Sequence, residues 1–148
     1  MRQLWDTVDV DVPPDRVWRW LAGLAEHYRG WHPDHVSAVW ERGAPNQVGS
    51  VLRVVEYLGG HREELRFEIT EVDPPRRMGY RMLGSHGVLL PGGAFMITPN
   101  DVGSRFTASI GYRFGAVTER LFSRRIAALG THLREEGANL KRLVEADD

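Results

Sequence analysis

The chain has 148 residues, of which 42% are hydrophobic and 26% are charged, and its formal net charge is −1. A chain of this size and hydrophobic content can bury a substantial core, which excludes an intrinsically disordered polypeptide. The almost neutral charge gives no reason to expect nucleic acid as a partner. We therefore expect residues 1–148 to form a single folded domain.

The sequence contains no cysteine, which excludes disulfides, thiolate metal ligands and a thiol nucleophile. Any metal ion would have to be bound by histidines and carboxylates. The sequence has no apolar stretch of 18 residues, and its N-terminus lacks the basic start and apolar run of a signal peptide. These features predict a cytoplasmic protein with no membrane partner.

Alternating apolar and polar residues predict a first strand from Leu4 to Val12. Pro13 and Pro14 then begin an amphipathic helix that is expected to reach about Tyr28. Clusters of Gly, Pro, Asn and Asp separate six further predicted strands, at 35–42, 48–58, 61–72, 76–83, 92–98 and 102–113. Strands joined by such short turns favour an antiparallel meander over a βαβ fold.

Residues 117–145 contain no proline and are predicted to form one long helix. Eight apolar side chains of this segment fall within an arc of about 140° on a helical wheel. They are Leu121, Phe122, Ile126, Leu129, Leu133, Leu140, Leu143 and Val144. Because such a stripe must be buried, we predict an α+β fold in which a curved antiparallel sheet of about seven strands encloses this helix and an interior cavity.

Three ionisable residues occupy positions that these patterns assign to the interior. His132 and Glu136 lie within the apolar stripe and are four residues apart, so their side chains stack on one helical face. In the strand 48–58, an outward Arg53 places Glu56 on the inner face. The alternative is that His132 and Glu136 form a simple hydrogen-bonded pair and that Glu56 reaches water at the strand end.

A second pair of histidines lies between the first helix and the second strand. His35 enters the strand and can point inward, whereas His32 precedes Pro33 and is expected to cap the site or face solvent. A surface position is the alternative for either residue. Together, a loop histidine, a strand glutamate and a helical His/Glu pair suit Zn²⁺, with Fe²⁺ or Mn²⁺ as further candidates.

The order of strand, helix, six-strand meander and long C-terminal helix resembles the helix-grip or START-like superfamily, which includes polyketide cyclases and lipid-binding proteins. Three segments, YRGWHPDH at 28–35, VVEYLGG at 54–60 and HLREE at 132–136, are similar to the metal-binding segments of the diacetylphloroglucinol and phloretin hydrolases. That resemblance implies a zinc ion held by two histidines and two glutamates. The matching ligands in this sequence are His35, Glu56, His132 and Glu136.

The same resemblance implies cleavage of a carbon–carbon bond between an acyl group and a phenolic ring, in a small hydrophobic or aromatic substrate. His32 or His61 would then serve as the proton donor. Five further side chains are candidates for contacts with the substrate: Tyr28, Tyr57, Tyr80, Tyr112 and His86. Two alternatives stay open, namely a START-like binding protein without catalysis and a metal-free polyketide cyclase or dehydratase.

Overall fold

The computed structural model describes residues 2–113 and 115–146. These residues form seven strands and five helices, in the order β1 (Arg2–Val10), α1 (Pro14–Ala22), α2 (Leu24–Trp31), β2 (His35–Arg42), β3 (Val51–Leu58), β4 (His61–Asp73), β5 (Arg77–Met82), α3 (His86–Leu89), β6 (Gly92–Asn100), β7 (Gly103–Tyr112), α4 (Ala116–Leu121) and α5 (Ser123–Ala146). The short helix α3 was not predicted.

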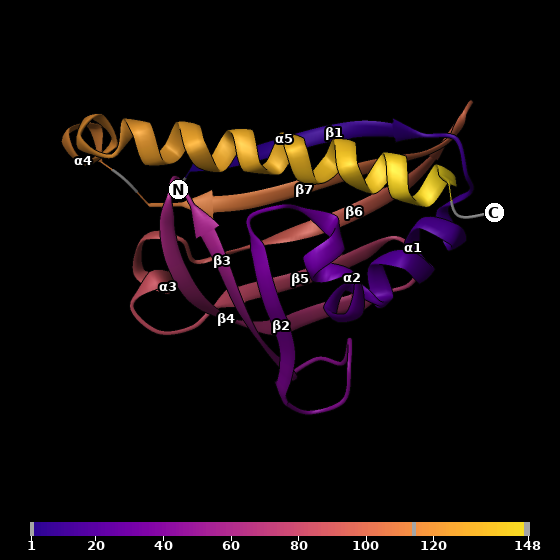
Figure 1. Cartoon of the computed structure of the whole chain (residues 1–148), viewed down its shortest axis with the longest axis horizontal. Coiled ribbons are helices and arrows are strands. Elements are labelled where there is room, and N and C mark those ends of the chain that lie inside the picture. Colours follow the sequence, from indigo (N-terminus) through magenta and orange to yellow (C-terminus); the bar gives the residue numbers. More distant parts are fainter. Residues whose placement is uncertain (1, 114, 147–148) are drawn as a thin grey trace.

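All seven strands form one antiparallel sheet with the order β1-β7-β6-β5-β4-β3-β2. β1 and β2 are the edge strands of this sheet. Helices α1 and α2 lie between these two strands in the chain. Figure 1 shows α5 lying along one face of the sheet beside β1 and β7, with α1 and α2 next to its C-terminal half. This arrangement is the helix-grip fold, as the sequence predicted.

The first predicted helix is divided into α1 and α2, so the expectation of one helix reaching Tyr28 was wrong. The division lies at Gly23, whose φ of −92° and ψ of 22° leave the helical region. Glycine is the weakest helix former after proline, and a bend there costs little. The bend allows Leu21, Leu24 and Tyr28 all to be buried.

The predicted helix 117–145 is also divided, into α4 and α5. The break lies at Phe122, with φ −103° and ψ 17°, and Ser123 begins α5. Because the wheel assumed one continuous helix, it assigned Leu121 to the buried stripe, whereas that side chain is 77% exposed. The prediction for Leu121 was therefore wrong, while the more C-terminal Leu133, Leu140 and Val144 are buried as expected.

A glycine allows α5 to approach the sheet closely. At Gly137, an added Cβ would lie 2.9 Å from Oδ2 of Asp6 and 3.7 Å from Cγ1 of Val8, both on β1. The close approach offsets the usual cost of glycine inside a helix, about 0.5–1 kcal/mol relative to alanine. It also brings the flanking residues of α5 toward the interior of the grip.

We predict that Leu140→Ala lowers the free energy of unfolding by about 2–5 kcal/mol, because Leu140 is fully buried and its truncation leaves a cavity. Leu121→Ala is the matched control and should change stability by less than about 0.5 kcal/mol. Urea unfolding monitored by circular dichroism measures both values. Equal effects of the two substitutions would contradict the observed division between α4 and α5.

Candidate functional site

Strand pairing places His35 beside Glu56. The two residues are register partners at the start of β2 and near the end of β3, so their side chains lie on the same face of the sheet. Arg53 is exposed and Glu56 is only 6% exposed, which confirms the inward direction predicted from strand phase. A loop histidine and a strand carboxylate thus meet inside the grip.

Helix α5 supplies the other two side chains. His132 and Glu136 are one helical turn apart, and Nε2 of His132 lies 3.5 Å from Oε2 of Glu136. The same nitrogen lies 3.5 Å from Oε2 of Glu56 on β3, which confirms the predicted proximity of these two residues. The helix and the sheet therefore converge on one point.

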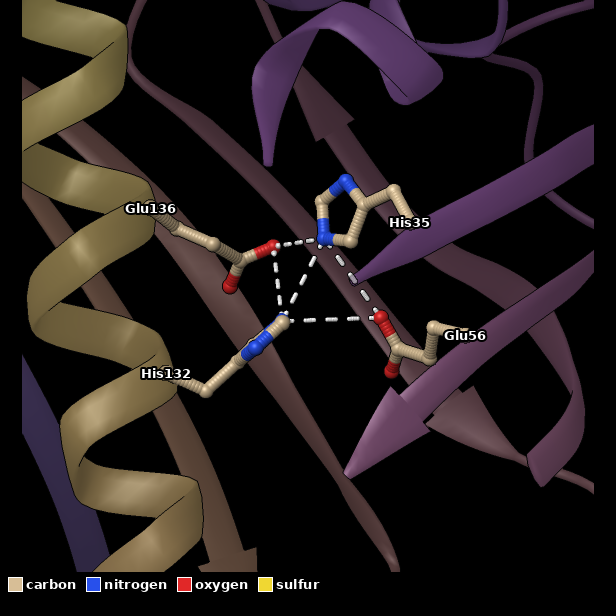
Figure 2. A group of neighbouring side chains, drawn as sticks. All are labelled: His35, Glu56, His132 and Glu136. Carbon is tan, nitrogen blue, oxygen red and sulfur yellow. Dashed lines mark hydrogen bonds and ion pairs between the residues drawn. The ribbon is translucent and has the colours of Figure 1, made fainter. Parts of the chain in front are cut away.

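One atom from each of the four side chains faces a common centre, as Figure 2 shows. Nε2 of His35 lies 2.9 Å from Oε2 of Glu136, 3.5 Å from Oε2 of Glu56 and 3.3 Å from Nε2 of His132. Ligands at about 2.0 Å from a tetrahedral zinc ion are separated by about 3.3 Å. Five of the six edges of this cluster, at 2.9–3.5 Å, therefore lie close to those of a zinc-sized tetrahedron, and the donor set suits the metal.

Tyr28 on α2 fixes two members of the cluster. Its backbone carbonyl accepts a hydrogen bond of 2.7 Å from Nδ1 of His35, which leaves Nε2 of that ring facing the centre. Its hydroxyl donates a 2.5 Å hydrogen bond to Oε2 of Glu56. The phenol ring also stacks on the His35 imidazole, with ring centroids 3.7 Å apart.

Two further hydrogen bonds hold α2 against α5. The indole Nε1 of Trp31 donates to the backbone carbonyl of Glu136 at 2.8 Å, and the side-chain amide of Asn139 donates to the carbonyl of Trp31 at 3.0 Å. Neither residue was predicted to be functional. A tryptophan and an asparagine carry no pattern that reveals a contact between segments so far apart in the chain.

The charges inside the cluster shift its pKa values strongly. Burial lowers the pKa of His132, but hydrogen bonds with Glu136 and Glu56 outweigh it and raise the pKa to about 10. Burial raises the pKa of Glu136, whereas hydrogen bonds with His132 and His35 lower it to about 2. Burial and the neighbouring Glu56 raise the pKa of Tyr28 well above its usual value. Without a metal ion, the cluster is thus held by ion pairs.

The structure separates the two candidate proton donors. His32 is 3% exposed, and its ring centroid lies 4.4 Å from that of His132. Its Nδ1 accepts a hydrogen bond from the backbone N–H of Asp34, and its Nε2 lies 3.5 Å from Oε1 of Glu135. His61 is exposed in the β3–β4 hairpin, and neither His32 nor His61 lines either of the two cavities beside α5.

A small cavity of about 90 Å³ lies next to the cluster. Its walls are apolar side chains of α2, the sheet and α5, and Glu56, His132 and Glu136 lie at its edge. Tyr28 and Tyr80 also line it, and burial followed by the charges of Glu136 and Glu56 raises the pKa of Tyr80. Both phenols therefore remain protonated at neutral pH. The hydroxyl of Tyr28 donates its proton to Glu56, whereas the hydroxyl of Tyr80 can donate a hydrogen bond into the cavity.

The other side chains considered as substrate contacts lie elsewhere. Tyr112 and His86 line a second, larger cavity of about 210 Å³, and Tyr57 is 41% exposed. Among the helices in residues 2–113 and 115–146, none is long and apolar enough to cross a membrane.

The fold and this interior site define a helix-grip protein that has a small-molecule cavity with a buried His/Glu cluster at its inner end. A family model described as "Polyketide cyclase / dehydrase and lipid transport" matches residues 1–145. The chain belongs to this family. No curated protein matches the sequence significantly.

Solved structures share the fold at low sequence identity. The protein TTHA0849 from Thermus thermophilus is 16% identical, with a TM-score of 0.79 and 98% of each chain covered. The di-domain ARO/CYC BexL from the BE-7585A biosynthetic pathway is 19% identical, with a TM-score of 0.77, and the match covers 99% of this chain and 51% of that one. Ara h 8.0201 is 15% identical, with a TM-score of 0.74 and 99% of each chain covered. These similarities establish the fold, while the finer resemblance to acylphenol hydrolases stays a prediction.

The pKa values of His132 and Glu136 predict how the metal-free protein responds to pH. A raised histidine pKa stabilises the fold below its ordinary value of 6.5, and this contribution is lost as the pH rises through about 10. A lowered glutamate pKa stabilises the fold above its ordinary value of 4.5, and this contribution is lost as the pH falls toward about 2. The stabilisation by the pair should therefore be largest between these two ordinary values.

Urea unfolding in the presence of EDTA tests this prediction. The difference in stability between the wild type and Glu136→Gln should peak in that interval and should decrease toward both higher and lower pH. Glu26→Gln, at an exposed position on α2, is the control and should show no such peak. A difference that is independent of pH would contradict the ion-paired cluster.

Proposed function

We propose that this protein binds a small hydrophobic or aromatic compound in its interior cavity and acts on a carbonyl group of that compound through a metal centre. The ligands would be His35, Glu56, His132 and Glu136, with zinc as the first candidate and Fe²⁺ or Mn²⁺ as the others. The observation that carries the proposal is the convergence of four ligand atoms within 4.8 Å of one another, at buried or nearly buried positions. Family membership supports the small-molecule cavity.

When bound, a divalent ion supplies Lewis acidity, which polarises a carbonyl oxygen or lowers the pKa of a water molecule. The chain's own residues would orient the substrate and control protons. The apolar cavity walls exclude water from the reacting group, and the hydroxyl of Tyr80 would donate a hydrogen bond toward it, while the hydroxyl of Tyr28 holds Glu56. His32 does not line the cavity, but it is buried against His132 and has exposed Glu135 beside its Nε2, and we assign it to the transfer of a proton from solvent toward the leaving carbon.

In this proposal the reaction is hydrolytic cleavage of a carbon–carbon bond between an acyl group and a phenolic ring or related ketone. Water adds to the acyl carbon, the carbon–carbon bond breaks, and the ring carbon takes up a proton. The products are a carboxylic acid and the deacylated phenol. The resemblance of the segments 28–35, 54–60 and 132–136 to the acylphenol hydrolases supports this reaction class.

A second candidate function needs no metal. The family includes cyclases and dehydratases by its description, and the His132–Glu136 and Tyr28–Glu56 pairs already form complete hydrogen-bonded acid–base units. In that case the same residues would move protons on an enolisable substrate, or the cavity would bind its ligand without catalysis. Metal content separates these candidates from the metal-dependent hydrolase.

We predict about one equivalent of zinc per chain in the purified wild-type protein, measured by elemental analysis after extensive dialysis. His132→Ala should lose the metal, because it removes one ligand, whereas His61→Ala should retain it, because His61 is exposed and separate from the cluster. EDTA should lower the Tm of the wild type and leave that of His132→Ala unchanged.

His32→Ala should keep most of the metal and lose turnover, since His32 is assigned to proton transfer and not to ligation. A wild-type protein that contains no metal and gains no thermal stability from added zinc would remove the metal-dependent proposal. It would favour the metal-free cyclase or the binding protein instead.

Tyr28→Phe should weaken zinc binding about 10- to 100-fold, because it removes the hydroxyl that orients Glu56 and keeps the ring that stacks on His35. Competition with a chromophoric chelator measures the affinity. Tyr57→Phe, at a 41% exposed position on the same strand as Glu56, is the matched control and should bind zinc as the wild type does. Identical affinities for the two variants would show that Tyr28 does not support the metal site.

A further inference from the structure

Two cavities lie beside α5. The inner chamber, of about 90 Å³, borders the His/Glu cluster, and the outer chamber, of about 210 Å³, lies toward α3 and the start of α5. Four leucines line both chambers and stand between them: Leu58, Leu65, Leu90 and Leu129. The two volumes together reach the lower end of the range for small-molecule sites, about 300–1,000 Å³. A ligand with one ring or a chain of medium length therefore suits this space.

The outer chamber has the more exposed lining. Gly59, Ser85, Leu89 and Arg125 line it and are exposed, whereas the inner chamber is lined mainly by buried side chains. A ligand that fills both chambers would pass between the four shared leucines, a route that we call the leucine passage. Its far end then lies among the outer lining residues.

Besides a tyrosine, three titratable side chains line the outer chamber: Glu63, His86 and Arg125. Glu63 accepts a 2.9 Å hydrogen bond from Nε2 of His86, so its carboxylate already has a partner. Arg125 lies 5.7 Å from the centre of the Phe122 ring. Within residues 2–113 and 115–146, no carboxylate lies within ion-pair distance of its guanidinium. Arg125 is thus a cation at the entrance that can accept an anionic partner.

The segment around Arg125 carries a net positive charge. Residues 113–125 contain four arginines and one acidic residue, Glu119, which forms an ion pair with Arg2. The backbone N–H of Arg113 donates to the carbonyl of Leu89, which places the start of this segment against α3 at the outer chamber. The resulting positive potential favours the approach of an anion over that of a cation.

We propose that the ligand is an amphipathic anion, with an apolar body that fills both chambers and a carboxylate or phosphate that pairs with Arg125 at the entrance. This inference deepens the proposed function, since it specifies the substrate class for the same cavity. The end of the ligand that bears the reactive carbonyl lies at the His/Glu cluster, and the anionic end lies at the opposite side of the leucine passage. Arg125 is then a specificity-determining residue.

Calorimetric titration with three probes of equal chain length tests the proposal: decanoate, 1-decanol and decyltrimethylammonium. Decanoate should bind the wild type about fivefold more tightly than decanol, as expected for an ion pair at an exposed arginine, and this preference should shrink at high salt. Arg125→Gln should reduce the affinity for decanoate to that for decanol and leave decanol binding unchanged. Arg125→Lys should restore part of the preference. Decyl phosphate in place of decanoate shows which anion the entrance favours.

Arg124→Gln is the matched control, because Arg124 is exposed on the same helical turn and does not line the chamber. It should keep most of the preference for decanoate. Equal affinities for the three probes, or a preference that survives Arg125→Gln, would overturn the proposal.

All titrations are run both with added zinc and with EDTA, because a carboxylate can also bind a metal ion directly. The Arg125-dependent preference should be present in both conditions. A preference seen only with zinc would overturn the role of Arg125 and would leave the metal-dependent function standing. Absence of metal from the protein, in contrast, would remove that function and leave the EDTA titrations able to support or reject the anionic ligand.

Discussion

The structure depends on the burial of two carboxylates and two imidazoles at one point inside a small apolar interior. Burying an ionised carboxylate costs several kcal/mol unless it is paired or coordinated. Glu56 is buried and Glu136 is nearly so, and both therefore need partners that the chain must bring from other elements. His35 and His132 are those partners, and their positions restrict how β2, β3 and α5 can be arranged.

Several local contacts hold β2, β3 and α5 in the arrangement that these partners require. Strand β2 begins at His35, directly opposite Glu56, because the turn after α2 ends there. Tyr28 holds the two side chains from α2, while Trp31 and Asn139 connect α2 to α5. The two short helices before β2 thus act as a brace between the sheet edge and the long helix. Loss of this brace would separate ligand atoms that lie 3.5 Å or less apart.

Much of this arrangement could be predicted from the sequence. The alternation around Arg53 placed Glu56 inside, and the helical spacing placed His132 and Glu136 together, because strand and helix periods are local properties of the chain. The resemblance of three short segments to metal-binding segments then identified His35. The breaks at Gly23 and Phe122 were not predicted, because a periodic pattern continues across a single distorted residue.

The position of His32 could not be predicted for a different reason. Both histidines of the segment 31–35 are buried, but only the pairing of β2 with β3 determines which of them faces Glu56. That pairing joins residues that are distant in sequence, so the local pattern of apolar and polar residues does not predict it. The same limit applies to Tyr28, whose contacts with His35 and Glu56 depend on the bend between α1 and α2.

The balance of charge within the cluster suits the proposed divalent ion. Without an ion, the two carboxylates need protonated imidazoles as their counter-charges. A divalent ion offsets both carboxylates while leaving the imidazoles neutral, as ligation requires. The hydrogen bond from Nδ1 of His35 to the Tyr28 carbonyl leaves Nε2 directed at the centre, where it would bind the ion. The geometry and the charge of these four side chains therefore support the same occupant, although the family is described by cyclase, dehydrase and lipid-transport functions and not by a metal.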